Sequence, residues 1–422
     1  MFEKNGEERL RLFSETAYPY EIKKINDRIY HVVGLGHSNS IAIEGKTSWI
    51  LVDTLDSDQR ALRMKAELAK IADKPVKTII FTHSHYDHHG GSGAFKDTVE
   101  EIIAFKPKKT PLKYYNLLDD VLQKRTSKQF GYALSDEECM TQGIGIREGR
   151  VVNDGTGICL DANVVYDQDI VEREIDGVKL QLVLAVGETD DQIFVWLPED
   201  KVLCCGDNYY GCFPNLYAIR GSQYRDIAAW VDSLNLILSY PAEVVLPGHT
   251  KAIIGQAQVQ EVLCNFKDAI EYILLETLKC MNKGMSESET VAAVVLPQKW
   301  ADLPYLGEFY GTVEWSVRSV YHGYFGWFDG NPTHLAQLSD DLYDAKLLSM
   351  IGEEKLESEI QTALKEEQYQ MAVQLCDILL NTKTDVQKYK KLKAEGLLGL
   401  SKYVTSANAR HYYLCSAKEL ME

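Results

Sequence analysis

The stretch Phe81–Gly91 constrains this chain more than any other part of its sequence. It reads Phe-Thr-His-Ser-His-Tyr-Asp-His-His-Gly-Gly and follows the apolar run 76–81, which predicts a short buried strand. The two glycines at its end predict a break in the backbone. Imidazole and carboxylate are the ligands that borderline divalent metals take, with zinc as the first candidate. The candidate metal ligands of the stretch are His83, His85, Asp87 and His88.

The order of these four side chains suggests two metal positions. In an extended or turning segment, His83 and His85 can point to one metal, whereas Asp87 and His88 lie past the turn and can serve a second. Short His-rich tracts also occur without a metal, so a solvated polar turn is the alternative interpretation. The rest of the chain decides between the two.

Three later segments each present one ligand-type side chain at a predicted strand end, beside a glycine. They are Ala185–Thr189 with Glu188, Cys205–Asn208 with Asp207 and Pro247–Thr250 with His249. Any one of them alone is better explained as an ordinary loop residue. Their joint occurrence favours a binuclear site, in which Glu188 completes the first metal, His249 completes the second, and Asp207 bridges them.

Asp53 closes an apolar run and has two interpretations. Its carboxylate can hold a metal-bound histidine in one tautomer. It can also cap the predicted helix over residues 59–71. The two roles are compatible, and the sequence does not choose between them.

Strand-like and helical patterns predict an α/β fold. Predicted strands cover residues 28–33, 40–43, 49–53, 76–81, 170–175, 179–186, 192–197, 202–205 and 244–250. Predicted helices cover 59–71 and 223–239 and, less clearly, 112–124 and 136–140. This alternation fits two sheets sandwiched between helices. Residues 256–422 are almost wholly helical in pattern, so we expect a catalytic domain over 1–255 and a helical domain over 256–422.

Composition limits the partners and the location. The formal net charge of −17 argues against nucleic acid as a partner. No apolar run approaches the ~18 residues of a membrane span, and the N-terminal residues lack the apolar core of a secretory signal. We therefore expect a cytoplasmic protein. The nine cysteines form no C-x-x-C pair that would indicate a structural zinc site.

The ligand segments resemble those of the metallo-β-lactamase superfamily. Glu188 stands where that superfamily usually has a third histidine, and this exchange is typical of the alkylsulfatase branch. Two further segments resemble that branch: Asn215–Gly221, which reads Asn-Leu-Tyr-Ala-Ile-Arg-Gly, and Gly326–Pro332, which reads Gly-Trp-Phe-Asp-Gly-Asn-Pro. Asp207 departs from the branch, which more often has glutamate there. A lipid-binding domain that usually ends these enzymes has no counterpart before Glu422, which leaves long-chain surfactants in doubt as substrates.

The resemblance implies a metallo-β-lactamase αββα sandwich, followed by an all-helical dimerisation domain with tetratricopeptide-like helix pairs. It implies a homodimeric hydrolase that cleaves alkyl sulfate esters through a water or hydroxide shared by two divalent metals. Zinc is the first choice, with manganese or iron as alternatives because Glu188 adds a hard oxygen ligand. Asp87, Asn215, Arg220 and Arg225 are the expected catalytic residues. Arg225 and Asn215 are the preferred sulfate contacts, since guanidinium matches an oxyanion bidentately.

Other functions are compatible with the same ligand set. Hydrolysis of a phosphoester, lactone or thioester would use the same fold, because a fold does not fix the substrate. A non-catalytic scaffold with structural metals is the alternative from another class. We expect the substrate to be a small anionic ester.

Overall fold

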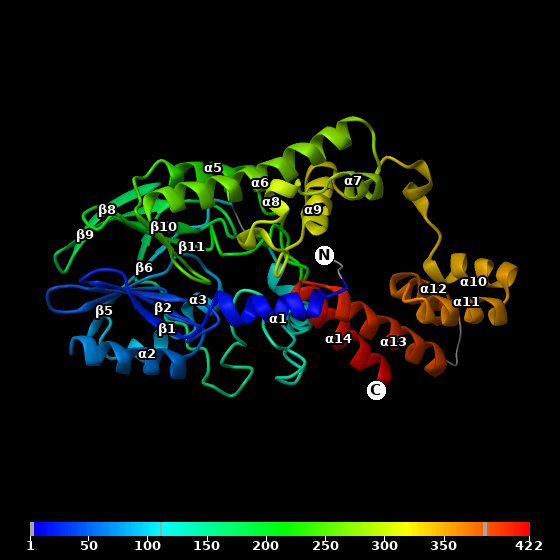
Figure 1. The fold of residues 1–422 in the computed structure, drawn as a ribbon, viewed down its shortest axis with the longest axis horizontal. Coiled ribbons are helices and arrows are strands. Elements are labelled where there is room, and N and C mark those ends of the chain that lie inside the picture. Colours follow the sequence, from blue (N-terminus) through cyan, green and yellow to red (C-terminus); the bar gives the residue numbers. More distant parts are fainter. Residues whose placement is uncertain (1–3, 110–111, 383–385) are drawn as a thin grey trace.

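The computed structural model describes residues 4–109, 112–382 and 386–422 (Figure 1). Two sheets lie face to face. The first has the strand order β1-β2-β3-β4-β5-β6-β7 and the second the order β13-β12-β11-β10-β9-β8. The strands of the first sheet are β1 (Glu21–Lys24), β2 (Ile29–Val33), β3 (Ser40–Glu44), β4 (Trp49–Val52), β5 (Val76–Ile80), β6 (Glu101–Phe105) and β7 (Val164–Tyr166). The strands of the second are β8 (Ile170–Ile175), β9 (Val178–Leu184), β10 (Ile193–Leu197), β11 (Val202–Gly206), β12 (Val244–Pro247) and β13 (Ile253–Ile254).

Helices cover both outer faces of the sheets and form the C-terminal part of the chain (Figure 1). The first nine are α1 (Gly6–Ala17), α2 (Asp58–Ile71), α3 (Tyr86–His89), α4 (Asp119–Phe130), α5 (Ile227–Leu238), α6 (Gln256–Asn282), α7 (Glu287–Ala293), α8 (Gln298–Ala301) and α9 (Val313–Phe325). The last five are α10 (Asp340–Ile351), α11 (Glu353–Lys365), α12 (Tyr369–Thr382), α13 (Gln387–Tyr403) and α14 (Ala407–Met421). Short 3-10 turns are η1 (Ser92–Phe95), η2 (Tyr115–Leu118), η3 (Pro304–Leu306) and η4 (Pro332–Ala336).

Strand β4 shows how the sequence produces the layers. Its four residues are all buried, and successive side chains of a strand point to opposite faces. Ile50 and Val52 join the core between the two sheets. Trp49 and Leu51 pack on the other side, in the core beneath α2. The outer face of the second sheet packs against α5, α6 and α9, so the αββα sandwich predicted from the sequence is confirmed.

The strand directions gather loop residues at one edge. Strands β4, β5, β6 and β7 run parallel in the first sheet, and β11 and β12 run parallel in the second. Parallel neighbours end on the same side, and polar side chains that follow such strands meet there. Asp53, His83, Asp207 and His249 all follow strands of these parallel sets.

The C-terminal helices pack as successive neighbours and return to the catalytic part of the chain. Helices α10 to α13 enclose a core of their own, which confirms the helical domain after the sandwich. Helix α14 packs on α4, and there the buried His411 donates from Nδ1 to the Gln129 carbonyl oxygen at 3.0 Å. Helix α6 and helix α9 share one core with the second sheet.

Two predicted helices are wrong or displaced. Residues 136–140 form turns, because Cys139 is held in a small core with Leu134 and the α14 residues Leu414 and Cys415. The helix predicted over 112–124 begins only at Asp119, preceded by a 3-10 turn and by Tyr114 with a positive φ of 66°. A left-handed residue interrupts a right-handed helix.

No helix within the three described ranges is both long enough and apolar enough to cross a membrane. The cytoplasmic location stays a prediction.

Candidate metal centre

The ligand stretch is held against β4 by a close backbone approach. After β5 the chain bends through His83, passes His85 in extended form and then enters the short helix α3, which bears Asp87 and His88. A Cβ atom at Gly91 would lie 1.9 Å from the carbonyl oxygen of Thr54. Only glycine permits that approach, so the Gly90-Gly91 pair fixes where the helix and its two ligands lie.

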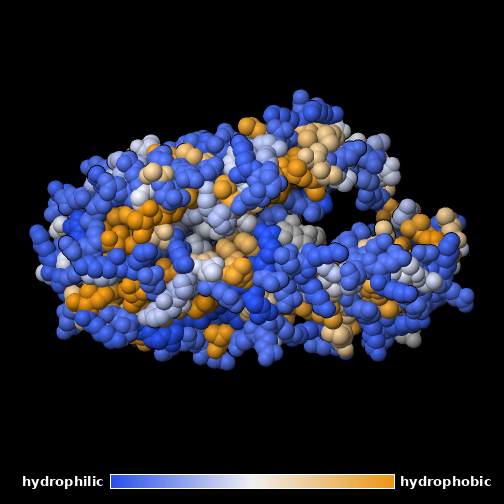
Figure 2. Space-filling view, in the orientation of Figure 1, coloured by the Kyte–Doolittle hydropathy of each residue, from blue (hydrophilic) through white to orange (hydrophobic). Residues whose placement is uncertain are grey.

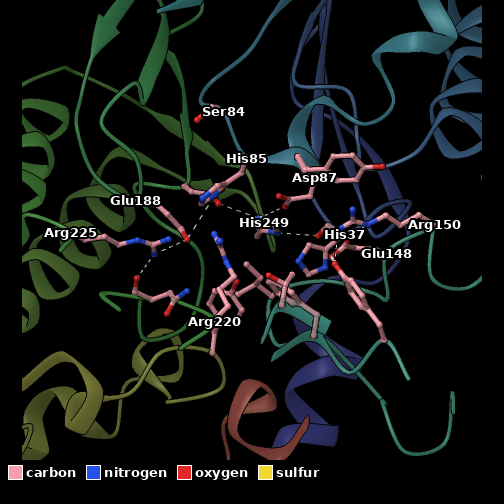
Figure 3. A pocket seen from close by; sticks show the side chains of 18 residues that line it. His37, Ser84, His85, Asp87, Glu148, Arg150, Glu188, Arg220, Arg225 and His249 are labelled. Carbon is pink, nitrogen blue, oxygen red and sulfur yellow. Dashed lines mark hydrogen bonds and ion pairs between the residues drawn. The ribbon is translucent and has the colours of Figure 1, made fainter. Parts of the chain in front are cut away.

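The first predicted group of ligands comes together. The distance from His83 Nε2 to His85 Nδ1 is 3.0 Å, and His85 Nδ1 lies 4.0 Å from Glu188 Oε1. Figure 3 shows Glu188 reaching His85 from the loop after β9. Two segments about 100 residues apart in sequence therefore converge on one point.

The second predicted group also comes together. Asp87 Oδ2 lies 3.4 Å from His88 Nε2 and 3.4 Å from His249 Nε2. Atoms that share a tetrahedral cation at ~2.1 Å lie ~3.4 Å from one another. The spacing of this group is that of a coordination shell.

Asp207 lies between the two groups. Its Oδ2 is 3.7 Å from His83 Nε2 and 3.3 Å from His249 Nε2, and its Oδ1 is 3.4 Å from His88 Nε2. One carboxylate therefore faces ligands of both groups. This is the position that the sequence predicted for a bridging ligand.

Several of these atoms are buried without a hydrogen-bond partner in the described part of the chain. They are His88 Nε2, His249 Nε2, Asp207 Oδ1 and Glu188 Oε2. A buried polar atom left unpaired costs ~1–3 kcal/mol, so four in one place need a common partner. Imidazole nitrogens and carboxylate oxygens that face one another are all satisfied by divalent cations. The residues present therefore fit a divalent metal centre.

Asp53 holds two residues of the ligand stretch, His88 and Thr82, in place by hydrogen bonds. Its Oδ2 accepts from His88 Nδ1 at 2.7 Å and from the Thr82 hydroxyl at 2.8 Å, and its Oδ1 accepts from the Thr82 backbone N–H at 2.8 Å. The bond to Nδ1 directs His88 Nε2 into the centre. Of the two interpretations from the sequence, the histidine contact is observed. The capping interpretation is wrong, because Ser57 caps α2.

The raised pKa values of two histidines in the second group show that this group attracts positive charge. Burial lowers the pKa of His88, but the carboxylates of Asp207, Asp87 and Asp53 outweigh it and hold that pKa well above its usual range. His249 follows the same pattern, and Asp207 and Asp87 raise its pKa to about 10. Bound cations would take the place of these protons, so metal binding is expected to release protons.

The two arginines differ in their partners. Arg225 Nη1 lies 2.8 Å from Glu188 Oε1, and the same guanidinium donates to the Asn215 carbonyl oxygen. Burial and then Arg225 and Arg220 lower the pKa of His85 to about 3, so both guanidiniums lie near it. Arg220 also lines the cavity over the centre, but within the described ranges its guanidinium has neither an ion pair nor a hydrogen bond. Arg220 is therefore the cation left available to an anionic ligand.

The cavity has a volume of about 250 Å³. Its wall opposite Arg225 contains residues that the sequence analysis did not identify as part of the site (Figure 3). Arg150 donates from Nε to Glu148 Oε2 at 2.6 Å and from Nη2 to the Tyr132 hydroxyl at 2.6 Å. Its guanidinium lies over the Tyr86 ring, 4.1 Å from the centroid. His37 lies nearby (Figure 3). Apart from Tyr86, which belongs to the ligand stretch, these residues lie in segments without a recognisable motif.

Removing the metal is expected to lower the thermal stability of the protein. The unfolded chain has no such cluster, so the binding free energy of the cations stabilises the folded state. Dialysis against a chelator should lower the unfolding midpoint by about 3 °C, the shift expected for ~2.7 kcal/mol of ligand stabilisation in a chain of this size. Scanning calorimetry before and after metal is returned checks this. An unchanged midpoint would contradict a filled centre.

Comparisons with known proteins agree with this geometry. The family described as the metallo-beta-lactamase superfamily matches residues 33–249, and the family described as alkyl sulfatase dimerisation matches residues 286–422. A linear primary-alkylsulfatase of Pseudomonas sp. (strain ATCC 19151) is 33% identical over 394 residues, which are 90% of this chain and 73% of that protein. The alkyl/aryl-sulfatase BDS1 of Saccharomyces cerevisiae (strain ATCC 204508 / S288c) is 28% identical over 94% of this chain and 64% of its own length.

Similarity in structure extends over nearly the whole chain. The stereoselective inverting sec-alkylsulfatase Pisa1 from Pseudomonas sp. superimposes with a TM-score of 0.86 and 24% sequence identity, covering 98% of this chain and 67% of that one. At this identity the likeness concerns the fold. The chain spans 60% to 73% of the length of the four alkylsulfatase relatives compared by sequence.

Proposed function

The chain belongs to the metallo-β-lactamase superfamily and to its alkylsulfatase family, and we propose that it hydrolyses alkyl sulfate esters to an alcohol and inorganic sulfate. One observation carries the proposal. The unpaired guanidinium of Arg220 faces the same cavity as the convergent metal-ligand side chains. A cation centre beside a free guanidinium suits an anionic ester, because both attract the oxygens of a sulfate group.

The proposed ligand set follows from the geometry of the two groups. Of the two positions, the first would be held by His83, His85 and Glu188 and the second by Asp87, His88 and His249, with Asp207 shared. Zinc is the proposed metal, since imidazoles predominate, and the carboxylates keep manganese or iron as alternatives. Bound divalent cations would supply Lewis acidity and lower the pKa of a coordinated water.

The protein's own side chains would orient the substrate and the ligands. Arg220, with the Asn215 amide, would hold the sulfate oxygens above the centre. Arg225 would act mainly by pairing with Glu188, so that this carboxylate keeps its direction toward His85. Asp87 would fix the orientation of His249 across the cavity. The apolar side chains that line the cavity, Phe130, Ile144 and Tyr310, would receive the organic part of the ester.

Phosphoester, lactone and thioester hydrolysis are the competing activities at the same centre. To distinguish these activities, turnover of primary and secondary alkyl sulfates is measured beside turnover of phosphate monoesters, lactones and thioesters, with zinc or manganese supplied. The proposal expects sulfate release to exceed turnover of the other classes. Turnover of only phosphate or acyl esters would overturn the sulfate assignment and leave the metal centre intact. Absence of any turnover with metal bound would favour the scaffold alternative.

We also propose that the protein is a homodimer and that the arm formed by residues 324–339 contributes to the interface. The arm comprises the last two residues of α9 and the connection to α10, and Figure 2 shows an open gap between it and the body of the molecule. Its large apolar side chains are exposed, and such a set indicates a binding surface. They are Tyr324, Phe325, Trp327, Leu335 and Leu338. The alkyl sulfatase dimerisation match spans the same residues.

Trp327, which is 72% exposed, is the expected anchor of that interface. A Trp327→Asp variant should weaken the dimer at least ~30-fold, the effect of losing an interface residue worth ~2 kcal/mol or more. Sedimentation velocity over a concentration series measures this. Leu12→Asp on α1 is the matched control, because Leu12 is 61% exposed and lies outside the arm. Equal dissociation constants for the two variants would place the interface elsewhere.

We keep the division of the chain into a catalytic domain, residues 1–255, and a helical dimerisation domain, residues 256–422, as a proposal. Helices α6 and α9 share the core of the sandwich, whereas α10 to α13 have their own.

A further inference from the structure

His37 is an additional imidazole at the edge of the second ligand group. Single ligand atoms of His37, Asp87 and His249 all lie within 4.8 Å of one another. The His37 side chain is nearly fully buried and lines the cavity beside His249 (Figure 3). The set of ligands predicted from the sequence does not include it.

The ring of His37 is held in one tautomer. Its Nδ1 lies 2.9 Å from the Ile146 carbonyl oxygen. A carbonyl oxygen only accepts, so Nδ1 carries the hydrogen and Nε2 keeps a lone pair. This is the arrangement that metal-binding histidines usually show, with the second ring nitrogen donating to a carbonyl or carboxylate.

The backbone of His37 is fixed on both sides. Its N–H donates to Asp56 Oδ1 at 2.8 Å, and its carbonyl oxygen accepts from His249 Nδ1 at 3.0 Å. Asp56 is itself buried and paired with Arg60 at 3.0 Å. A Cβ atom at Gly145 would lie 1.9 Å from the His37 carbonyl oxygen, so the neighbouring loop is packed against it. The position of His37 is therefore fixed by its backbone contacts.

The groups around His37 form a cluster of acceptor atoms that attracts positive charge. Nε2 is its remaining acceptor, Asp87 is a carboxylate, and His249 Nε2 has no hydrogen-bond partner in the described chain. Acceptors this close repel unless a positive charge lies among them. A cation in the second position would satisfy all three.

We propose that His37 is a further ligand of the cation in the second position, beside Asp87, His88, His249 and the shared Asp207. The inference rests on the metal centre of the proposed function, but it does not depend on the substrate. It makes the two positions unequal. The second has three imidazoles and the first has two, so the second favours zinc more strongly over harder cations.

The test measures metal binding directly. Apoprotein of the wild type and of the variants His37→Gln and His37→Ala is titrated with Zn²⁺ by calorimetry and with Co²⁺ by visible absorption. Both variants keep the backbone contacts of residue 37 with Asp56 and His249. One of the two equivalents should bind about 10- to 100-fold more weakly while the other is unchanged. The Co²⁺ absorption should also intensify as the coordination number falls.

His411→Gln is the matched control. His411 is also buried and also donates from Nδ1 to a carbonyl oxygen, but it lies on α14, away from the centre. Its two metal equivalents should bind as in the wild type. Circular dichroism at the titration temperature shows that each variant is folded.

Unchanged affinities and an unchanged Co²⁺ spectrum in both His37 variants would overturn the inference. A loss of turnover without those changes would overturn it as well, because His37 would then act on the substrate. If the wild type binds two metal equivalents but releases no sulfate, the proposed function is wrong and this inference is unaffected.

Discussion

An Asp207→Ala variant should bind less than one metal equivalent tightly and lose about 10³-fold or more in kcat. Asp207 faces His83, His88 and His249 within 3.3 to 3.7 Å, so its removal takes a ligand from both positions. A bound cation contributes several kcal/mol to stabilisation of the transition state, and each ~1.4 kcal/mol is tenfold in rate. Metal content after gel filtration and initial rates of sulfate release measure the two effects together.

Two further variants separate the roles of Asp207. Asp207→Asn keeps the shape of the side chain but removes its negative charge, so we expect most of the same loss. Asp200→Ala removes a carboxylate that pairs with Arg28 in the turn before β11, and it should keep both equivalents. An Asp207→Ala protein that retains two equivalents and normal turnover would exclude a shared carboxylate at this position.

Arg220→Ala should reduce kcat/KM for alkyl sulfates by about 30- to 10³-fold while metal content stays at two equivalents. This guanidinium lines the cavity without an ion pair in the described chain, so its loss leaves no buried carboxylate unpaired. The magnitude corresponds to ~2–4 kcal/mol for a charged contact to a bound anion. Steady-state kinetics with a sulfate ester, together with metal analysis, measures it. Arg220→Lys should recover part of the loss, because a lysine keeps the charge but not the bidentate geometry.

Comparing Arg225→Ala with Arg220→Ala tests whether the two arginines have different roles. Its guanidinium is paired with Glu188 at 2.8 Å, and both side chains are buried. Removing one partner of a buried pair costs ~3–5 kcal/mol, so this variant should lose thermal stability and metal affinity as well as activity. The same selective kinetic loss in both arginine variants would contradict the distinction. It would restore the expectation from the sequence that Arg225 is the main sulfate contact.

The side chains that the sequence singled out lie together in the structure because most of them follow strands. Each of His83, Asp207 and His249 comes directly after a buried apolar run, and parallel strands bring such positions to one edge. The sandwich was predictable for a similar reason, since strands such as β4 send alternate residues to two cores. The family resemblance supplied what spacing alone does not, namely the expected substrate class and the expected role of the helical domain in dimerisation.

The missed features depend on tertiary contacts. His37 stands in the loop between β2 and β3, with nothing nearby in sequence to mark it as a ligand-type residue of the site. The contacts of Arg150 with Glu148 and Tyr132 lie in a stretch of turns, where periodicity gives no signal. The pairing of Arg225 with Glu188 joins two loops 37 positions apart and decides which arginine is free. The parallel strands β6 and β7 were also missed, because their apolar runs are short.

The most direct test of the account is a metal titration of the apoprotein followed by sulfate release from a short primary alkyl sulfate. Zinc is added in steps, and released sulfate is measured by ion chromatography at each step. We expect turnover to reach its maximum at two equivalents per chain and to vanish when a chelator is added. Full sulfate release from metal-free protein, or none with two equivalents bound, would contradict a two-metal alkylsulfatase.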